Sequence, residues 1–90
     1  MLLDNKTIFD NLLSEHKLIP EFLHKTPEES HIYKFANFDE SIKVYVDVWE
    51  TGSVSIIVKE DNKKIQYCCD IEDGYTLIDI IKRELELNKE

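Results

Sequence analysis

The sequence has few of the residues that would build a phosphate-binding loop or a disulfide framework. It contains two glycines, two prolines and two cysteines, and Arg83 is its only arginine. Both glycines fall in predicted turns, which leaves none for a loop that cradles phosphates. Cys68 and Cys69 are adjacent in the sequence and cannot form a disulfide framework. These shortages argue against a glycine-rich phosphate-binding loop and against a domain stabilised by disulfides.

Positive charge is also scarce. The chain has 11 basic and 19 acidic residues, for a net charge of -8 at pH 7. Nucleic acids and anionic membranes are polyanions, so this charge disfavours direct binding to either. No hydrophobic run approaches the length of a membrane span, and the N-terminus lacks the basic and apolar segments of a signal peptide. We expect a cytoplasmic protein whose partner is a protein with a basic surface.

The composition is that of a small globular domain. Hydrophobic residues make up 42% of the chain and charged residues 33%, a balance typical of folded proteins. The 90 residues predict a single domain, 1–90. A chain of this length buries only roughly 60% of its unfolded surface, so we expect modest stability.

Two helical segments are predicted before the sheet. Apolar residues at helical spacing predict a helix over 5–16, which Asp4 or Asn5 can cap. Pro20 suits the first turn of a helix, so 20–25 is predicted as a short second helical turn. Its apolar side would carry Ile19, Phe22 and Leu23.

Four strands are predicted at 31–38, 42–49, 53–60 and 63–71, from their period-two alternation. A loop at Glu50-Thr51-Gly52 and a loop at Asp61-Asn62 place only apolar residues on one face of the last three strands. The resulting pairs are Val48–Val54, Val46–Ile56, Val44–Val58, Glu60–Lys63, Val58–Ile65, Ile56–Tyr67 and Val54–Cys69.

The first hairpin has two possible registers. A loop at Asp39-Glu40 places Tyr33 and Phe35 on the face of Val44, and a loop one residue longer places Ile32, Ala36 and Phe38 there. The sequence does not decide between them.

A last helix is predicted over 77–88, with Thr76 and Asp79 resembling a capping box. The predicted fold is therefore α+β: a four-stranded antiparallel β-meander with an N-terminal helix, a short second helical turn and a C-terminal helix. The side chains expected in the core are Leu12, Val46, Val48, Ile56, Val58, Ile65, Tyr67, Ile78 and Ile81.

No residue pattern indicates catalysis or metal binding. Cys68 and Cys69 point to opposite faces of a strand, so they cannot share a metal ion. His16, His24 and His31 match no compact metal-ligand spacing. Carboxylates are spread along the whole chain, and no pair stands out as acid and base. We expect a non-enzymatic protein without cofactor or metal.

The face of the sheet opposite the valine core is the main candidate for function. Trp and Tyr among short polar residues are typical of protein-binding surfaces. A helix that covers this face is the alternative, because two helices can lie one on each side of a sheet. The residues predicted to bind a partner are Tyr45, Asp47, Trp49, Ile57, Lys59 and Asp70.

The chain carries no family motif. In size, acidity and compactness it resembles the small, single-domain proteins with which phages block host defence enzymes. That resemblance implies an inhibitor that covers a protein surface. The second hypothesis is a structural or accessory subunit that self-associates, as a homodimer for example, through the Trp49 face or an open sheet edge. An enzyme or metal protein ranks last.

Overall fold

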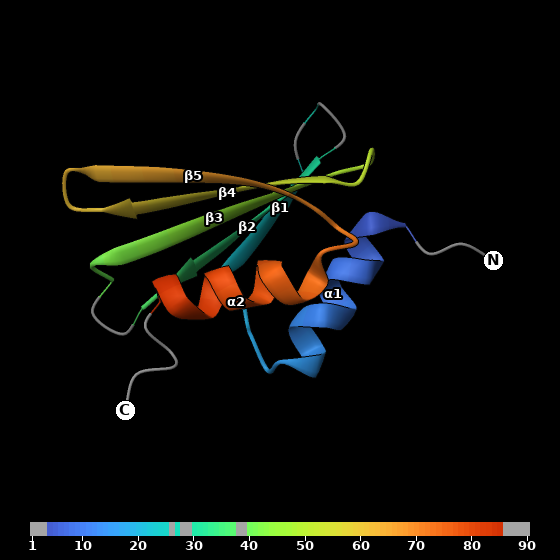
Figure 1. The fold of residues 1–90 in the computed structure, drawn as a ribbon, viewed down its shortest axis with the longest axis horizontal. Coiled ribbons are helices and arrows are strands. Elements are labelled where there is room, and N and C mark those ends of the chain that lie inside the picture. Colours follow the sequence, from blue (N-terminus) through green and yellow to red (C-terminus); the bar gives the residue numbers. More distant parts are fainter. Residues whose placement is uncertain (1–3, 26, 28–29, 38–39, 86–90) are drawn as a thin grey trace.

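The chain forms one antiparallel sheet of five strands, with two helices, in the part that the structure describes (Figure 1). The structure is a computed structural model and describes residues 4–25, 27, 30–37 and 40–85. In chain order the elements are α1 (Asn5–Glu15), β1 (Phe22–Lys25), β2 (Ser30–Ala36), β3 (Ile42–Trp49), β4 (Ser53–Glu60), β5 (Lys63–Asp70) and α2 (Gly74–Glu84). Neither helix of this described part is long and apolar enough to cross a membrane.

The predicted α+β class and antiparallel meander are confirmed, but the prediction of four strands is wrong. The sheet has the order β1-β2-β3-β4-β5. The additional strand, β1, occupies the segment predicted as a second helical turn. Leu23 lies opposite Tyr33, and Lys25 lies opposite His31. A four-residue strand is held by its pairing with β2, the next strand of the same hairpin, and helix propensity within 20–25 does not report that pairing.

The two predicted hairpin registers are confirmed. Val46 lies opposite Ile56, and Ile56 lies opposite Tyr67 on the next strand. Gly52 has a φ of 95°, the left-handed conformation that the three-residue loop requires. In the first hairpin Tyr33 lies opposite Val46, which selects the register with the shorter loop. Asp39 in that loop, and Phe38 before it, lie outside the described residues.

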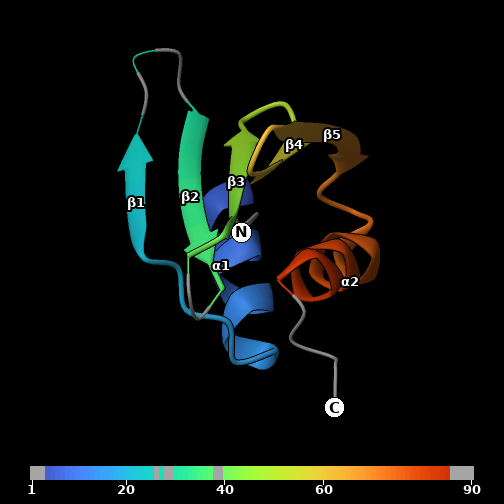
Figure 2. The same cartoon turned by 90° about the vertical axis from the view of Figure 1, so that its left-hand side faces the viewer.

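Both helices pack on the same face of the sheet (Figure 2). We call this the inner face. It carries the buried side chains of Tyr33 and Phe35 from β2, Val44, Val46 and Val48 from β3, and Val54, Ile56 and Val58 from β4, which form one core with both helices. The alternative of one helix on each side of the sheet is therefore wrong. The opposite face, called the outer face below, has no described helix over it.

The helix boundaries follow from local contacts. Asp4 caps α1 by accepting a hydrogen bond from the backbone N–H of Thr7 at 2.7 Å. Helix α2 begins at Gly74, so Thr76 lies inside its first turn and the predicted capping box is wrong. A Cβ atom at Gly74 would lie 2.9 Å from Cδ1 of Leu12, so the glycine permits the close approach of α2 to α1. Residues 86–88 of the predicted helix lie outside the described part.

Six of the nine predicted core residues are fully buried: Val46, Val48, Ile56, Val58, Ile78 and Ile81. Leu12 and Tyr67 are half-buried and pack against the core. The prediction for Ile65 is wrong, because its side chain is 44% exposed. Ile65 lies on the inner face, opposite Val58, as predicted. It is exposed because the β4–β5 hairpin extends beyond the end of α2 (Figure 1).

Candidate functional site

The outer face is a continuous surface built from alternate residues of the strands. Strand pairing places Tyr45 between Lys34 and Ile57, and Asp47 between Ile32 and Ser55. The residues that the four long strands contribute to this face are Ser30, Ile32, Lys34, Ala36, Lys43, Tyr45, Asp47, Trp49, Ser53, Ser55, Ile57, Lys59, Lys64, Gln66, Cys68 and Asp70.

A shallow hollow of about 240 Å³ lies in the middle of the outer face. It is lined by four of the predicted partner-binding residues, Tyr45, Asp47, Ile57 and Lys59, together with Ile32 and Lys64. The ammonium group of Lys59 lies 5.3 Å from the centre of the Tyr45 ring, within the range of a cation–π interaction. The hollow therefore combines apolar walls with charge of both signs.

Asp47 contributes an unusual polar group to this hollow. Its Oδ1 atom is shielded from solvent and has no hydrogen-bond partner among the described residues. Its cross-strand neighbours, Ile32 and Ser55, leave that oxygen unpaired. An unsatisfied buried acceptor costs about 1–3 kcal/mol. A donor from another molecule would recover this free energy.

Three lysines form a row across the outer face. Lys43 lies directly opposite Lys59, and Lys59 lies opposite Lys64. Within the described part, none of the three forms an ion pair. Like charges directly opposite on neighbouring strands destabilise a sheet, so this end of the face would gain from a bound anionic group.

Trp49 and Asp70 lie away from the hollow, toward the end of the sheet near α1. Trp49 is half-buried and lies opposite Ser30, while Asp70 lies opposite Ser53. The side-chain amide of Asn5 in α1 donates hydrogen bonds to the backbone carbonyls of Trp49 at 3.2 Å and Glu50 at 2.6 Å. The backbone at Trp49 is thus fixed to α1 independently of the indole ring.

Sequence reasoning missed Ile32, Lys34 and Lys64 as members of this surface. Ile32 and Lys34 could not be placed while the first hairpin had two possible registers. Lys64 follows directly from the predicted pair Glu60–Lys63, because the next pair along the ladder joins Lys59 to Lys64. The lysine row was therefore available from the sequence.

The two cysteines are free and lie on opposite faces of β5. Cys69 packs against the core, and burial raises the pKa of its thiol, which lowers the fraction of reactive thiolate. Cys68 is exposed on the outer face. Among the described residues there is no group of three or more His, Cys, Asp and Glu side chains that could hold a metal ion.

One buried tyrosine joins α1 to the sheet. The hydroxyl of Tyr33 donates a hydrogen bond to Oδ1 of Asp10 at 2.7 Å, and Lys6 binds Oδ2 of the same carboxylate at 2.6 Å. Burial, followed by the bond to Asp10, raises the pKa of Tyr33 far above its usual value. The hydroxyl therefore stays protonated and acts as a structural donor.

Neither family models, nor curated proteins, nor solved structures gave a match to this chain. The chain's own residues, above all those of the outer face, are therefore what points to a function.

Proposed function

We propose that this chain is a non-enzymatic protein-binding module that docks a protein partner on its outer face. The observation that carries the proposal is the position of the helices. Both α1 and α2 pack on the inner face, and no described helix covers the face that carries Tyr45, Trp49 and Ile57.

The chemistry of the face supports a protein as the partner. Protein interfaces are enriched in Tyr and Trp, which offer large rigid contact areas with polar groups at the edge. Tyr45 lies beside Ile57 in the central hollow, and the unpaired oxygen of Asp47 offers an acceptor to an incoming donor. Together these groups provide an apolar centre and directional polar contacts.

The charges suggest how the partner is oriented. The net charge of -8 favours encounter with a basic protein and should speed association at low salt. Asp47 and Asp70 would meet the basic groups of that partner. The row of Lys43, Lys59 and Lys64 would meet an acidic group at the other end of the face.

The mode of action that fits these properties is surface blocking. A rigid sheet face can cover a functional surface of a larger protein without any chemical step. We propose that the chain is encoded by a phage or another mobile element and that it inhibits a host defence protein.

The Trp49→Ala substitution tests the proposal. We expect it to weaken partner binding by about 2 kcal/mol or more, roughly thirtyfold in Kd, if Trp49 is a hot spot. The melting temperature should change little, because the Asn5 amide bonds the backbone carbonyl of Trp49, and the substitution keeps that carbonyl. Affinity capture from the source cell identifies the partner, and calorimetry with that purified partner measures the loss.

Tyr75→Ala is the matched control for this experiment. Tyr75 is 85% exposed on α2, on the other side of the sheet. The variant should bind the partner like the wild type. A folded Trp49→Ala variant with full affinity would instead move the docking surface to the helices or a sheet edge.

The Asp47→Thr substitution should have opposite effects on stability and binding. Removal of the unpaired oxygen is expected to raise the free energy of unfolding by about 1 kcal/mol, and to weaken binding because the acceptor is lost. Urea denaturation and calorimetry measure the two quantities. Ser55→Thr on the neighbouring strand is the control, since it adds the same β-branched side chain and keeps the carboxylate. Equal stabilisation by both variants would show that the Asp47 oxygen carries no cost.

A further inference from the structure

Strand β5 forms an open edge of the sheet. It is the last strand in the order, and no described element lies beyond it. It has eight residues, and Lys64, Gln66, Cys68 and Asp70 on its outer-face side are exposed. A long edge strand is a template for pairing with another strand. The opposite edge, β1, has only four residues.

The hairpin geometry determines which backbone groups of β5 are free. The two residues that flank a two-residue loop form a hydrogen-bonded pair, and such pairs alternate along the ladder. Here that pair is Glu60–Lys63. Lys64, Gln66 and Cys68 therefore direct their N–H and C=O groups to the open edge. Asp70 offers its N–H there, since its carbonyl already accepts the N–H of Asp73 at 2.9 Å.

We infer that β5 pairs with β5 of a second copy of this chain, antiparallel and with the two-fold axis at Tyr67. The axis is perpendicular to the sheet, so both inner faces lie on the same side. For the inner faces to match, each even-numbered residue of β5 must lie opposite an even-numbered residue of the second copy, and each odd-numbered residue opposite an odd-numbered one. With the axis at Tyr67, the edge-directed residues 64, 66, 68 and 70 of one copy overlap completely with those of the other.

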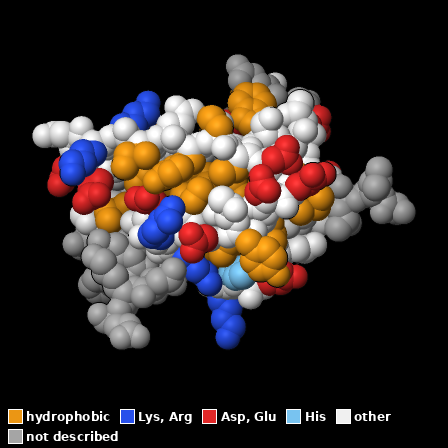
Figure 3. All heavy atoms as spheres, viewed as in Figure 1, with side chains coloured by type: hydrophobic (Ala, Val, Ile, Leu, Met, Phe, Trp, Pro, Cys, Tyr) orange, Lys and Arg blue, Asp and Glu red, His pale blue; other side chains and the backbone are white. Residues whose placement is uncertain are grey.

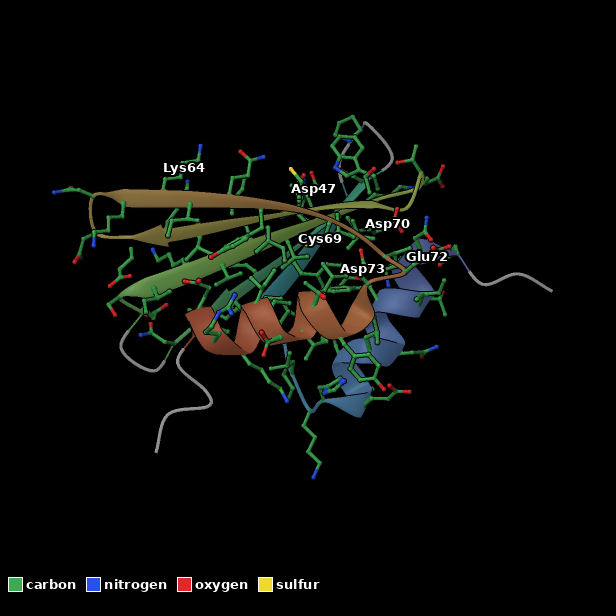
Figure 4. The ribbon with its side chains drawn as sticks, viewed as in Figure 1. Asp47, Lys64, Cys69, Asp70, Glu72 and Asp73 are labelled. Atoms are coloured by element: carbon green, nitrogen blue, oxygen red, sulfur yellow. The ribbon has the colours of Figure 1, made fainter. Side chains whose placement is uncertain are left out.

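The side chains in this register are complementary to themselves. Lys64 faces Asp70 of the second copy, and the symmetry repeats this opposite-charge pair at the other end of the strand. On the inner face Ile65 faces Cys69 of the second copy, and the two Tyr67 side chains face each other. Figure 4 shows Lys64 and Asp70 toward opposite ends of β5, as the pairing requires. Cross-strand pairs of these kinds stabilise antiparallel sheets.

Exposed apolar surface at this edge is consistent with the pairing. Ile65 is 44% exposed, and Tyr67 and Cys69 are half-buried. Figure 3 shows hydrophobic side chains in a band between the positions of β5 and α2. Lysine on an edge strand usually discourages pairing, but here Asp70 of the second copy compensates Lys64.

Other registers that preserve the faces lose this complementarity. If the axis moves to Gln66, Lys64 faces Cys68 and Asp70 has no partner strand residue. If it moves to Cys68, the two Cys68 residues face each other and Lys64 extends past the end of β5. Only the axis at Tyr67 joins both charges and the apolar residues.

A dimer of this kind has a consequence for binding. Its two outer faces form one continuous surface on the same side of a joined sheet. Two docking surfaces would then face the same way, and a partner with repeated sites would gain avidity. The dimer itself does not depend on the proposed partner, so Trp49→Ala should leave it unchanged.

Charge reversal tests the register. Sedimentation equilibrium at physiological salt should give a wild-type dimer of about 21 kDa, twice the chain mass of 10.7 kDa. Lys64→Glu and Asp70→Lys should each raise the dimer dissociation constant by about tenfold or more, because like charges then face each other. An equimolar mixture of the two variants should dimerise again. Across that heterodimer the introduced glutamate faces the introduced lysine, and the unchanged Asp70 of one chain faces the unchanged Lys64 of the other.

Lys43→Glu is the control for net charge, because Lys43 lies on β3 and away from the edge. This variant should dimerise like the wild type. A wild-type chain that stays monomeric up to millimolar concentration overturns the proposal. So does a dimer that Lys43→Glu and Lys64→Glu weaken equally, or one that the mixture of variants fails to restore.

Cross-linking gives a test that does not depend on Asp70, whose carboxylate also accepts the N–H of Glu72 at 3.0 Å. In a Cys68→Ser background, Ile65→Cys should form a disulfide with Cys69 of the second copy under mild oxidation. The two positions are about 13 Å apart within one strand, too far for a bond inside one chain. Cys68→Ser alone should stay uncrosslinked. The absence of a disulfide-linked dimer from the Ile65→Cys variant would refute the register.

Discussion

Replacement of Phe9 by alanine is expected to lower the free energy of unfolding by about 3–5 kcal/mol, the range for a buried phenylalanine. Phe9 is fully buried between α1 and the sheet. Its ring lies edge-on to Tyr33, with a centroid distance of 4.8 Å and an angle of 68° between the ring planes. The substitution removes this aromatic pair and leaves a cavity under α1. Urea denaturation followed by circular dichroism measures the loss.

This loss of unfolding free energy is a large fraction of the total stability expected for so short a chain. Domains have total stabilities of about 5–15 kcal/mol, and small ones lie at the lower end. We therefore expect Phe9→Ala to unfold partly on mild heating. Tyr75→Ala is the control, because the Tyr75 side chain is 85% exposed and should contribute little. If both variants lost similar stability, α1 would not be anchored through Phe9.

The hairpins of β3, β4 and β5 could be predicted because two independent signals agree. Alternation places Val46 and Ile56 on one face, and the turn residues Gly52 and Asp61 fix the same register. A shift by one residue would place charged residues in the core. Where the hydrophobic pattern and the turn residues predict the same register, a single sequence is sufficient to predict how the strands pair.

Strand β1 and the first hairpin could not be predicted, for different reasons. The segment after Pro20 is too short to show a period, and its strand exists because Leu23 pairs with Tyr33 on the next strand, outside the segment itself. In the first hairpin both registers bring apolar residues to the inner face. The structure buries Tyr33 and Phe35 there and leaves Ile32 on the outer face.

The outer face was predicted in composition but not in shape. The alternation of residues along β3 and β4 placed Tyr45, Asp47, Ile57 and Lys59 on one face. In the structure these four side chains line one hollow. That both helices pack on the inner face depends on tertiary packing. The only indication in the sequence was charge, since Asp47, Lys59 and Asp70 interrupt the apolar area of this face and suit a surface that contacts water.

The second large expected effect compares two isoleucines on neighbouring strands. Ile56 and Ile65 both have inner-face parity, and sequence alone predicts both as core residues. Ile56 is fully buried, whereas Ile65 is 44% exposed. We expect Ile56→Ala to cost about 2–4 kcal/mol, because it leaves a cavity among the valines of β3 and β4.

Ile65→Ala serves as the matched control and should cost less than about 1 kcal/mol in the monomer, because much of its surface already contacts water. Urea denaturation in dilute solution compares the two variants. Equal losses would mean that Ile65 is covered in the monomer. If the cost of Ile65→Ala instead grows with protein concentration while that of Ile56→Ala does not, the additional burial comes from a second copy. That is the behaviour expected of β5 paired across its open edge, because only the dimer places Ile65 opposite Cys69.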